Sequence, residues 1–352
     1  MHRLIPVRLT LLVPELLWPE PGGRHAPPLP GFAWLAGRAA FRQGPASPFE
    51  IALAGRFGMA SQGLGALRLF GEASGDLAAD GYWLCADPVH LRFHHERIVL
   101  ADASAFDLAE GEARELVDAL NAEFADVGEL HAATARRWYL RLNPAGDAFA
   151  ELRGLAAAPL SAVAGRRVDL AGRGAAWSRW LNAVQMALHR HPLNARREEA
   201  GLPAVNSLWP WGGGGLTRSR SSPFSAVWSD HPLAAGLAHA AGAPHHPLPD
   251  GLDALLRLAS SGSAPLVVLD HLLAPACYED HAAWQQAWRR LETVWFGPLR
   301  RQLGRSVAAL EIIAPTAFGE LQCALQGRDR WKFWRRPAPL AALADRFAKG
   351  KP

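Results

Sequence analysis

Residues 264–315 constrain the fold more than any other part of the chain. The apolar run "APLVVLD" (264–270) predicts a buried strand, and "SVAALEIIAP" (306–315) predicts a second one. Between them, residues 280–297 predict a Trp-rich helix with Trp284 and Trp288 on one face. A strand, a long helix and another strand are the pattern of a parallel βαβ unit. The sequence therefore predicts an α/β fold with a mainly parallel sheet flanked by helices.

The length and composition indicate a folded protein with a large core. A chain of 352 residues suits one large α/β domain or two domains that share an interface. Hydrophobic residues make up 49% and charged residues 20%, which is too apolar for a disordered chain. The net charge of +4 argues only weakly for an anionic partner, and phosphorylated metabolites fit it as well as nucleic acid does.

Apolar periodicity predicts further elements in the first 190 residues of the chain. They are a first strand within 8–17, a short helix over 32–42, a hairpin over 82–102, a helix over 107–124, a strand over 136–142 and a helix over 175–190. Asp107 is expected to cap the helix that follows it, with Glu110 three residues on. Pro192 is expected to stop the helix that ends near residue 190.

Cysteine usage and the start of the chain bear on the compartment. Cys85, Cys277 and Cys323 are scattered and form no CxxC motif, so neither a disulfide framework nor a thiolate zinc site is implied. The opening "MHRLIPVRLTLLVPELLWPE" has an apolar run interrupted by charged residues and prolines, so it predicts a strand rather than a signal peptide. No apolar run reaches the ~20 residues that span a bilayer. We expect a cytoplasmic protein without a membrane span.

The motifs of several catalytic classes are missing from the sequence. There is no GxSxG elbow and no serine with a recognisable His and Asp partner. The glycine run at 212–215 is not a P-loop, because no Gly-Lys-Ser/Thr follows it. A glycine-rich loop can still turn its backbone N–H groups toward an anion. An anion-binding loop and a flexible turn therefore both stay open for this run.

The chain has 14 histidines, but none lies in an HExxH motif. The weak metal candidates are two Asp-His pairs, Asp270 with His271 and Asp280 with His281. Asp270 ends a predicted buried strand, where α/β folds place functional groups. The alternative is that Asp270 only caps the turn after its strand and that the histidines lie in surface loops.

The segment "RDRWKFWRRP" (328–337) interleaves cationic and aromatic side chains. This pattern is compatible with a nucleic-acid or membrane-surface patch. A partly buried terminal strand with solvated charges is the favoured interpretation.

The segment "HPLNARREEAGLPAVNSLWPWGGGG" (191–215) carries a specific resemblance. A His-Pro-x-Asn pattern, an arginine three residues later, then Gly, Asn and a glycine run resemble the archaeal-type cofactor-independent phosphoglycerate mutases of the alkaline-phosphatase superfamily. The tryptophans make it still more similar to the bacterial RpfE-type regulatory proteins. The positions that the resemblance implies as ligand-binding are His191, Asn194, Arg197, Asn206, Trp209, Trp211, Gly212 and Gly214.

The resemblance implies an alkaline-phosphatase-like core, residues 1–60 and 217–352, with a smaller inserted α+β domain, residues 61–216. It also implies two metal ions held by aspartates and histidines, but the matching places in this chain lack those residues. The family's first strand ends in an Asp-Gly turn where this chain has "LVPELLWPEPGG", and its last strand ends in Asp-His where this chain has "APTAFG". A site without its carboxylates and imidazoles cannot hold the ions.

We therefore expect a phosphoglycerate-mutase-like pseudoenzyme with a regulatory or phosphometabolite-binding role and no cofactor. The segment 191–215 would then line a retained cleft or, equally well, serve packing alone. The expected partner is a phosphorylated small molecule or another protein, and nucleic acid is disfavoured. The alternative is an active phosphomutase or phosphohydrolase that binds Mn or Zn through Asp270, His271, Asp280 and His281.

Overall fold

The protein is described by a computed structural model that covers residues 5–18, 26–59, 61–72, 75–94, 97–147, 149–154, 157–168, 175–219 and 221–348. The chain divides into two compact units. Unit 1 comprises Met1–Leu53 and Arg220–Pro352, and unit 2 comprises Ala54–Ser219. The domain boundaries expected from the sequence, 60/61 and 216/217, lie within seven and three residues of this division.

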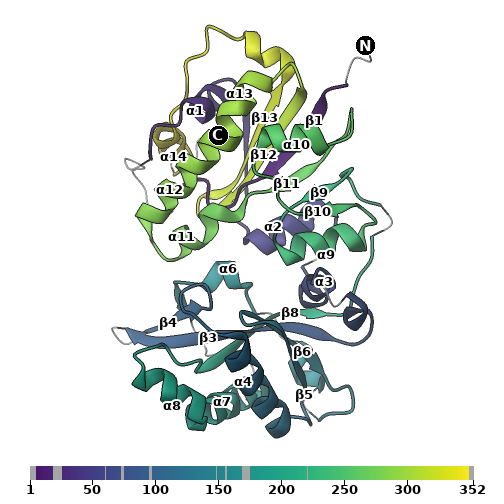
Figure 1. Ribbon diagram of the computed structural model, residues 1–352, viewed down its shortest axis with the longest axis vertical. Helices are drawn as coiled ribbons and strands as arrows, with labels where there is room; N and C mark the ends of the chain where they lie inside the picture. Colours follow the sequence, from purple (N-terminus) through teal and green to yellow (C-terminus); the bar gives the residue numbers. More distant parts are fainter. Residues whose placement is uncertain are drawn as a thin grey trace. The chain divides into compact units, whose positions relative to one another are not determined.

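Unit 1 contains a seven-stranded sheet with the order β10-β9-β11-β1-β12-β13-β2 (Figure 1). The strands from β10 to β12 are parallel, while β13 pairs antiparallel with both β12 and β2. The bounds are β1 Val7–Leu12, β2 Ala40–Gly44, β9 Val227–Trp228, β10 His245–His246, β11 Leu266–Val268, β12 Val307–Thr316 and β13 Gly319–Gln326. The predicted mainly parallel sheet is confirmed.

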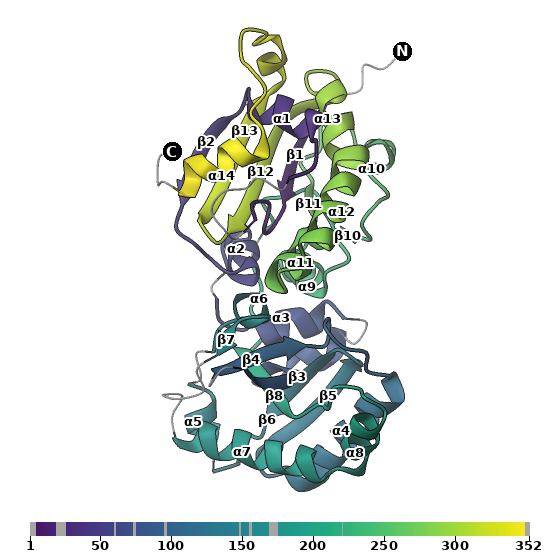
Figure 2. The same cartoon turned by 90° about the vertical axis from the view of Figure 1, so that its left-hand side faces the viewer.

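The helices of unit 1 pack their aromatic side chains against this sheet. α12 (His281–Leu291) continues through a π-helical turn (Glu292–Phe296) into α13 (Gly297–Gln302), and the whole segment runs along the sheet in Figure 2. Trp284, Trp288 and Phe296 share one buried core with Leu9 and Ile312 of the strands. The other helices are α1 Pro30–Ala36, α9 Pro232–Ala240, α10 Leu252–Leu258, α11 Leu273–Cys277 and α14 Leu340–Ala348. α2 Phe49–Arg56 begins in unit 1 and ends in unit 2. The predicted βαβ unit is therefore present, with β1 lying between its two strands.

Unit 2 is an α+β unit with a six-stranded antiparallel sheet. The long β3 (Trp83–His94) pairs with β6 and β8 through its first half and with β4 through its second half. The remaining strands are β4 Arg97–Asp102, β5 Gly128–Thr134, β6 Arg137–Leu142, β7 Arg167–Val168 and β8 Ser207–Gly214. The helices are α3 Leu64–Phe70, α4 Glu110–Glu123, α5 Phe149–Leu152, α6 Leu160–Val163, α7 Ala175–Arg190 and α8 Pro192–Glu199.

The hairpin, the strand over 136–142 and the two long helices predicted for unit 2 are confirmed. The expected caps need correction. α4 begins at Glu110, and the carboxylate of Glu112, rather than that of Asp107, accepts the backbone N–H of Ala109 at 2.8 Å. α7 does end at Arg190, before Pro192, as predicted. Pro192 also begins α8, because its missing N–H is tolerated in the first turn of a helix.

Two predictions for unit 1 are wrong. The helix expected over 32–42 ends at Ala36, and residues 40–44 form the edge strand β2. The backbone carbonyl of Arg336 lies 2.1 Å from the position that a Cβ on Gly37 would occupy. The distant segment around Arg336 therefore packs directly on the backbone at residue 37. The segment 328–337 is not a strand, because Gly327–Trp331 form a 3₁₀-helix followed by turns and coil.

Candidate functional site

The carboxyl ends of the parallel strands of unit 1 meet at one edge of the sheet, which is the usual ligand-binding edge of α/β folds. Glu15 follows β1, Asp230 follows β9, Asp270 follows β11, and Thr316 ends β12. Several of these groups already have partners inside unit 1. Asp230 accepts the backbone N–H of Leu248 at 2.9 Å, and the Thr316 hydroxyl donates to the carbonyl of Gly319 at 2.8 Å.

Asp270 and His271 begin a single 3₁₀ turn directly after β11. Burial raises the pKa of the Asp270 carboxyl, and the charge of Asp230 raises it further, although His271 acts in the opposite direction. Nδ1 of His271 is buried and has no hydrogen-bond partner among the described residues. This pair thus combines a buried carboxyl group with a buried ring nitrogen that has no hydrogen-bond partner among the described residues.

Asp280 and His281 have structural contacts at the start of α12. A carboxylate oxygen of Asp280 accepts the N–H of Ala283 at 2.9 Å, so Asp280 is the N-cap of the helix. The imidazole of His281 packs against Trp18, with ring centroids 5.0 Å apart, and stacks on Trp284 at 6.1 Å. The indole of Trp284 donates to the carbonyl of Glu15 at 3.1 Å, which ties α12 to the loop after β1.

The residues at this edge do not fit a two-metal site. Within the described ranges, no three His, Cys, Asp or Glu side chains gather closely enough to hold a metal ion. A site for two divalent ions needs several carboxylates and imidazoles around one cavity.

The polar side chains of α8 bond within unit 2. Nδ1 of His191 accepts the N–H of Leu193 at 3.2 Å and caps α8. The buried amide of Asn194 donates to the carbonyls of Leu188 and Val205, both at 2.8 Å, and accepts the N–H of Val205 at 2.9 Å. These contacts join the end of α7 to the segment that enters β8.

Arg197 is buried, with only 2% of its side chain exposed, and its guanidinium bonds to three groups of unit 2. It donates to Glu112 at 2.7 Å, to the carbonyl of Pro203 at 2.9 Å and to the carbonyl of Asp107 at 2.5 Å. Burial opposes ionisation of Glu112, but the N–H of Ala109 and the guanidinium of Arg197 outweigh it and lower its pKa. All three nitrogens of this guanidinium are thus used. Two of them hold α8 to α4 and to the residues just before it, and Nε holds α8 to the loop that follows it.

The side chains of the strand that follows are also used within unit 2. The amide of Asn206 bonds both the N–H and the carbonyl of Leu91, at 2.7 and 2.9 Å, and so extends the pairing of β8 with β3. Trp209 and Trp211 are each 1% exposed. Their indole N–H groups donate to the carbonyl of Ala158 and to the carboxylate of Asp87.

The glycine run completes β8 and packs against the start of α3. The carbonyl of Gly213 accepts the N–H of Gly63 at 3.0 Å. A Cβ on Gly214, whose φ is +154°, would lie 2.5 Å from the nitrogen of Gly63. A Cβ on Gly212 would lie 3.0 Å from the Cβ of Leu64 and 3.1 Å from the nitrogen of Gly65. Backbone thus approaches backbone here, which explains why the segment uses glycine. Gly212, Gly213 and Gly214 therefore belong to β8, and Gly215 follows the strand.

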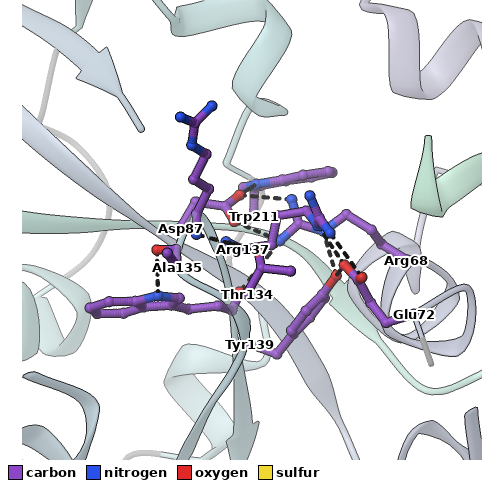
Figure 3. A network of polar contacts seen from close by, with 10 residues as sticks. Arg68, Glu72, Asp87, Thr134, Ala135, Arg137, Tyr139 and Trp211 are labelled. Carbon is purple, nitrogen blue, oxygen red and sulfur yellow. Dashed lines mark hydrogen bonds and ion pairs between the residues drawn. The ribbon is translucent and has the colours of Figure 1, made fainter. Parts of the chain in front are cut away.

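Arg68 is the centre of a polar network that includes Asp87 and that the sequence did not predict (Figure 3). Arg68 of α3 makes two hydrogen bonds to the carboxylate of Asp87 on β3, at 2.6 and 3.0 Å. Its Nε donates to the Tyr139 hydroxyl at 2.9 Å, and that hydroxyl donates to Glu72 at 2.8 Å. Glu72 also accepts two bonds from Arg137, at 2.6 and 3.0 Å.

The charges of this network stabilise one another. Burial alone lowers the pKa of Arg68, but the carboxylate of Asp87 outweighs it and raises that pKa well above its ordinary value. Burial also raises the pKa of the Tyr139 hydroxyl, which stays a neutral donor. A charged residue inside an apolar stretch, such as Asp87 within "WLCADPV", is the signal that sequence reasoning could have used.

Unit 2 also has a cavity of about 690 Å³ beside the start of β3. Tyr82, Asn121, Asn143 and Phe149 line it together with Glu129 and Arg141. The last two face each other across the β5–β6 pair. The guanidinium of Arg141 is the group here that suits an anionic ligand.

Comparison with solved structures finds distant proteins that are similar to this chain. The PH0037 protein from Pyrococcus horikoshii matches with a TM-score of 0.57 and 15% identity, over 97% of this chain and 92% of that chain. A cofactor-independent phosphoglycerate mutase from Thermoplasma acidophilum is 15% identical over 97% and 95% of the two chains, with a TM-score of 0.44. No family model matches the chain, and no curated protein matches it either. The first likeness shows that the chain shares the fold of PH0037.

Proposed function

We propose that this protein is a phosphoglycerate-mutase-like pseudoenzyme, with an alkaline-phosphatase-like core in unit 1, that acts by binding rather than by catalysis. The observation that carries the proposal is the internal use of the polar groups after β1 and at α12. Asp280 caps the helix, His281 packs between two tryptophans, and Trp284 bonds the carbonyl of Glu15. Groups held in this way support packing rather than ligation of two metal ions.

The proposed ligand is a phosphorylated small molecule or a protein partner, in a regulatory role like that of the RpfE-type proteins. The resemblance of residues 191–215 supports a phosphorylated ligand. Among the positions that the resemblance implies as ligand-binding, His191, Asn206, Gly212 and Gly214 are partly exposed. The buried polar atoms of Asn194, Arg197 and Trp211 would act indirectly, by holding those groups in place. The cavity beside Arg141 is a second place where a phosphate could meet a guanidinium.

Turnover by the purified protein tests the pseudoenzyme proposal. The protein is incubated with Mn²⁺ or Zn²⁺ and either 3-phosphoglycerate or p-nitrophenyl phosphate, and 2-phosphoglycerate and phosphate are measured. We expect no turnover above that of heat-denatured protein. Robust metal-dependent turnover would overturn the proposal.

The alternative function is an active phosphomutase or phosphohydrolase with a divergent site. It is favoured by one observation, the buried Asp270 beside His271 at the carboxyl edge. Under this alternative, the joint replacement Asp270→Ala and His281→Ala abolishes any turnover. An unchanged rate in a folded double variant would remove it.

A further inference from the structure

The segment from Arg328 to Arg336 presents large aromatic side chains to solvent. Trp331, Phe333 and Trp334 are 66%, 83% and 66% exposed. Large aromatic side chains are more often buried than exposed, and here three of them are exposed within four positions of the sequence. We call these three residues the aromatic cluster.

The segment is held firmly in unit 1 although its rings are exposed. Asp329 is buried, accepts the N–H of Gln326 at 2.7 Å and pairs with Lys332 at 2.9 Å. Arg330 donates to the carbonyl of Gly304 at 3.1 Å, and the N–H of Ala338 donates to that of Ala33 at 2.9 Å. The aromatic cluster is therefore displayed by an anchored loop.

Cationic side chains surround the aromatic cluster. Arg328, Arg335 and Arg336 are exposed. In the described part of the chain, neither Arg335 nor Arg336 forms an ion pair. The only carboxylate between residues 327 and 337 is that of Asp329, which is already used by the helix cap and by Lys332. The surface is therefore both apolar and positive.

The ring geometry favours a lipid surface over a single-stranded nucleic acid. Binding of unpaired bases needs open aromatic faces on which bases can stack. The guanidinium of Arg330 lies 4.6 Å from the centroid of the Trp331 ring and covers one face. The rings of Phe333 and Trp334 meet edge to face, at 5.2 Å and 84°, so they form no stacking ladder. Tryptophan and phenylalanine beside arginines are instead typical of the headgroup level of a bilayer.

We propose that residues 328–336 dock the protein peripherally on an anionic lipid bilayer. The aromatic cluster enters the headgroup region, while Arg328, Arg335 and Arg336 contact lipid phosphates and carboxylates. No membrane-crossing helix is needed for this, and none of the helices in the described ranges is long and apolar enough to be one. The segment follows β13 at the end where β12 begins, which is the edge of the sheet opposite to Asp270 (Figure 1).

Vesicle flotation of the full chain tests this docking. The protein is mixed with vesicles of phosphatidylcholine alone or of phosphatidylcholine with phosphatidylserine, at increasing NaCl. We expect binding only to the mixed vesicles, weakening as salt rises. A fluorescent single-stranded DNA and an RNA oligonucleotide are titrated in parallel.

Two variants and a matched control locate the contact. The double variant Arg335→Gln/Arg336→Gln is expected to weaken vesicle binding roughly 25-fold, about fivefold for each lost charge. Replacing all three residues of the aromatic cluster with Ser should weaken it about tenfold or more. Arg289→Gln/Arg290→Gln removes an equal charge from the exposed face of α12 and should bind like the parent.

The outcomes separate the proposal from its rivals. The docking surface would be established if the parent protein binds vesicles, the variants at Arg335/Arg336 and in the aromatic cluster lose this binding, and the Arg289/Arg290 control keeps it. Absence of vesicle binding, or equal loss in the control, would overturn it. Oligonucleotide binding that the Arg335/Arg336 variant loses, without vesicle binding, would overturn it in favour of nucleic acid.

Discussion

Removal of the Asp87 carboxylate should selectively destabilise unit 2. Its side chain is 1% exposed and that of its partner Arg68 is 5% exposed, so solvent cannot replace the lost ion pair. Breaking a buried pair on one side costs about 3–5 kcal/mol, because a buried charge is left uncompensated. The indole N–H of Trp211 also loses its acceptor. We therefore expect Asp87→Leu to cost at least about 3 kcal/mol.

The double variant Arg68→Met/Asp87→Leu should be more stable than Asp87→Leu alone. Apolar replacement of a whole buried pair is often neutral, so removing the second charge should restore about 2 kcal/mol or more. The surface pair of Arg196 and Glu115 provides the control, because Arg196→Met should change stability by less than about 1 kcal/mol.

Amide hydrogen exchange read peptide by peptide can measure these effects in each unit. Peptides from β3 and β8 report the opening free energy of unit 2, and peptides from β12 report that of unit 1. We expect the peptides from β3 and β8 to lose exchange protection in Asp87→Leu and to regain part of it in the double variant. Strictly additive losses, or equal losses in β12, would refute the account of a coupled network confined to unit 2.

Further predictions concern single groups. Because the pKa of Glu112 is lowered, its carboxylate stabilises unit 2 above the ordinary glutamate pKa, and this contribution is lost as the pH falls through the lowered value. The variant Glu112→Gln should lower the free energy of unfolding by about 2–3 kcal/mol at neutral pH. It should also flatten the decrease of Tm at acidic pH, and an unchanged decrease would contradict this prediction. Glu292 accepts the N–H groups of Gly31 and Phe32 at 2.5 and 3.0 Å, so Glu292→Ala should cost unit 1 about 1–3 kcal/mol in urea unfolding. Burial raises the pKa of the Cys323 thiol well above its ordinary value, so it should react with DTNB only after denaturation, and rapid native labelling would be inconsistent with the core.

Elements set by local pattern could be predicted, and those set by distant pairing could not. The helix over 175–190 and the strands around residues 266 and 310 follow from periodicity within each segment. β2 exists because β13, almost 280 residues later, pairs with it, and no local signal in "AAFRQG" reveals that partner. The segment 328–337 was likewise interpreted as a partly buried strand, because its pattern gives no sign that two distant contacts hold it as a loop with exposed rings.

The roles of the candidate site residues also depend on partners that are distant in the sequence. Residue types at 191–215 suggested either a cleft or packing, but their partners, such as Leu91, Glu112 and Asp87, are about 80 to 125 residues away. The ligand-binding role of this segment stays a prediction. Asp270 was correctly placed at a strand end, whereas the capping role of Asp280 depended on where α12 begins.

The most direct test of the central claim is a calorimetric titration of the purified, metal-stripped protein with Mn²⁺, with and without 3-phosphoglycerate. The pseudoenzyme account predicts no stoichiometric metal uptake in either condition, and 3-phosphoglycerate binding that needs no metal would identify a phosphometabolite ligand. The variant Arg141→Gln then distinguishes the cavity of unit 2 from the 191–215 segment as its site. Tight uptake of about two ions would contradict the account, because it would mean that the residues of this chain do form a two-metal centre.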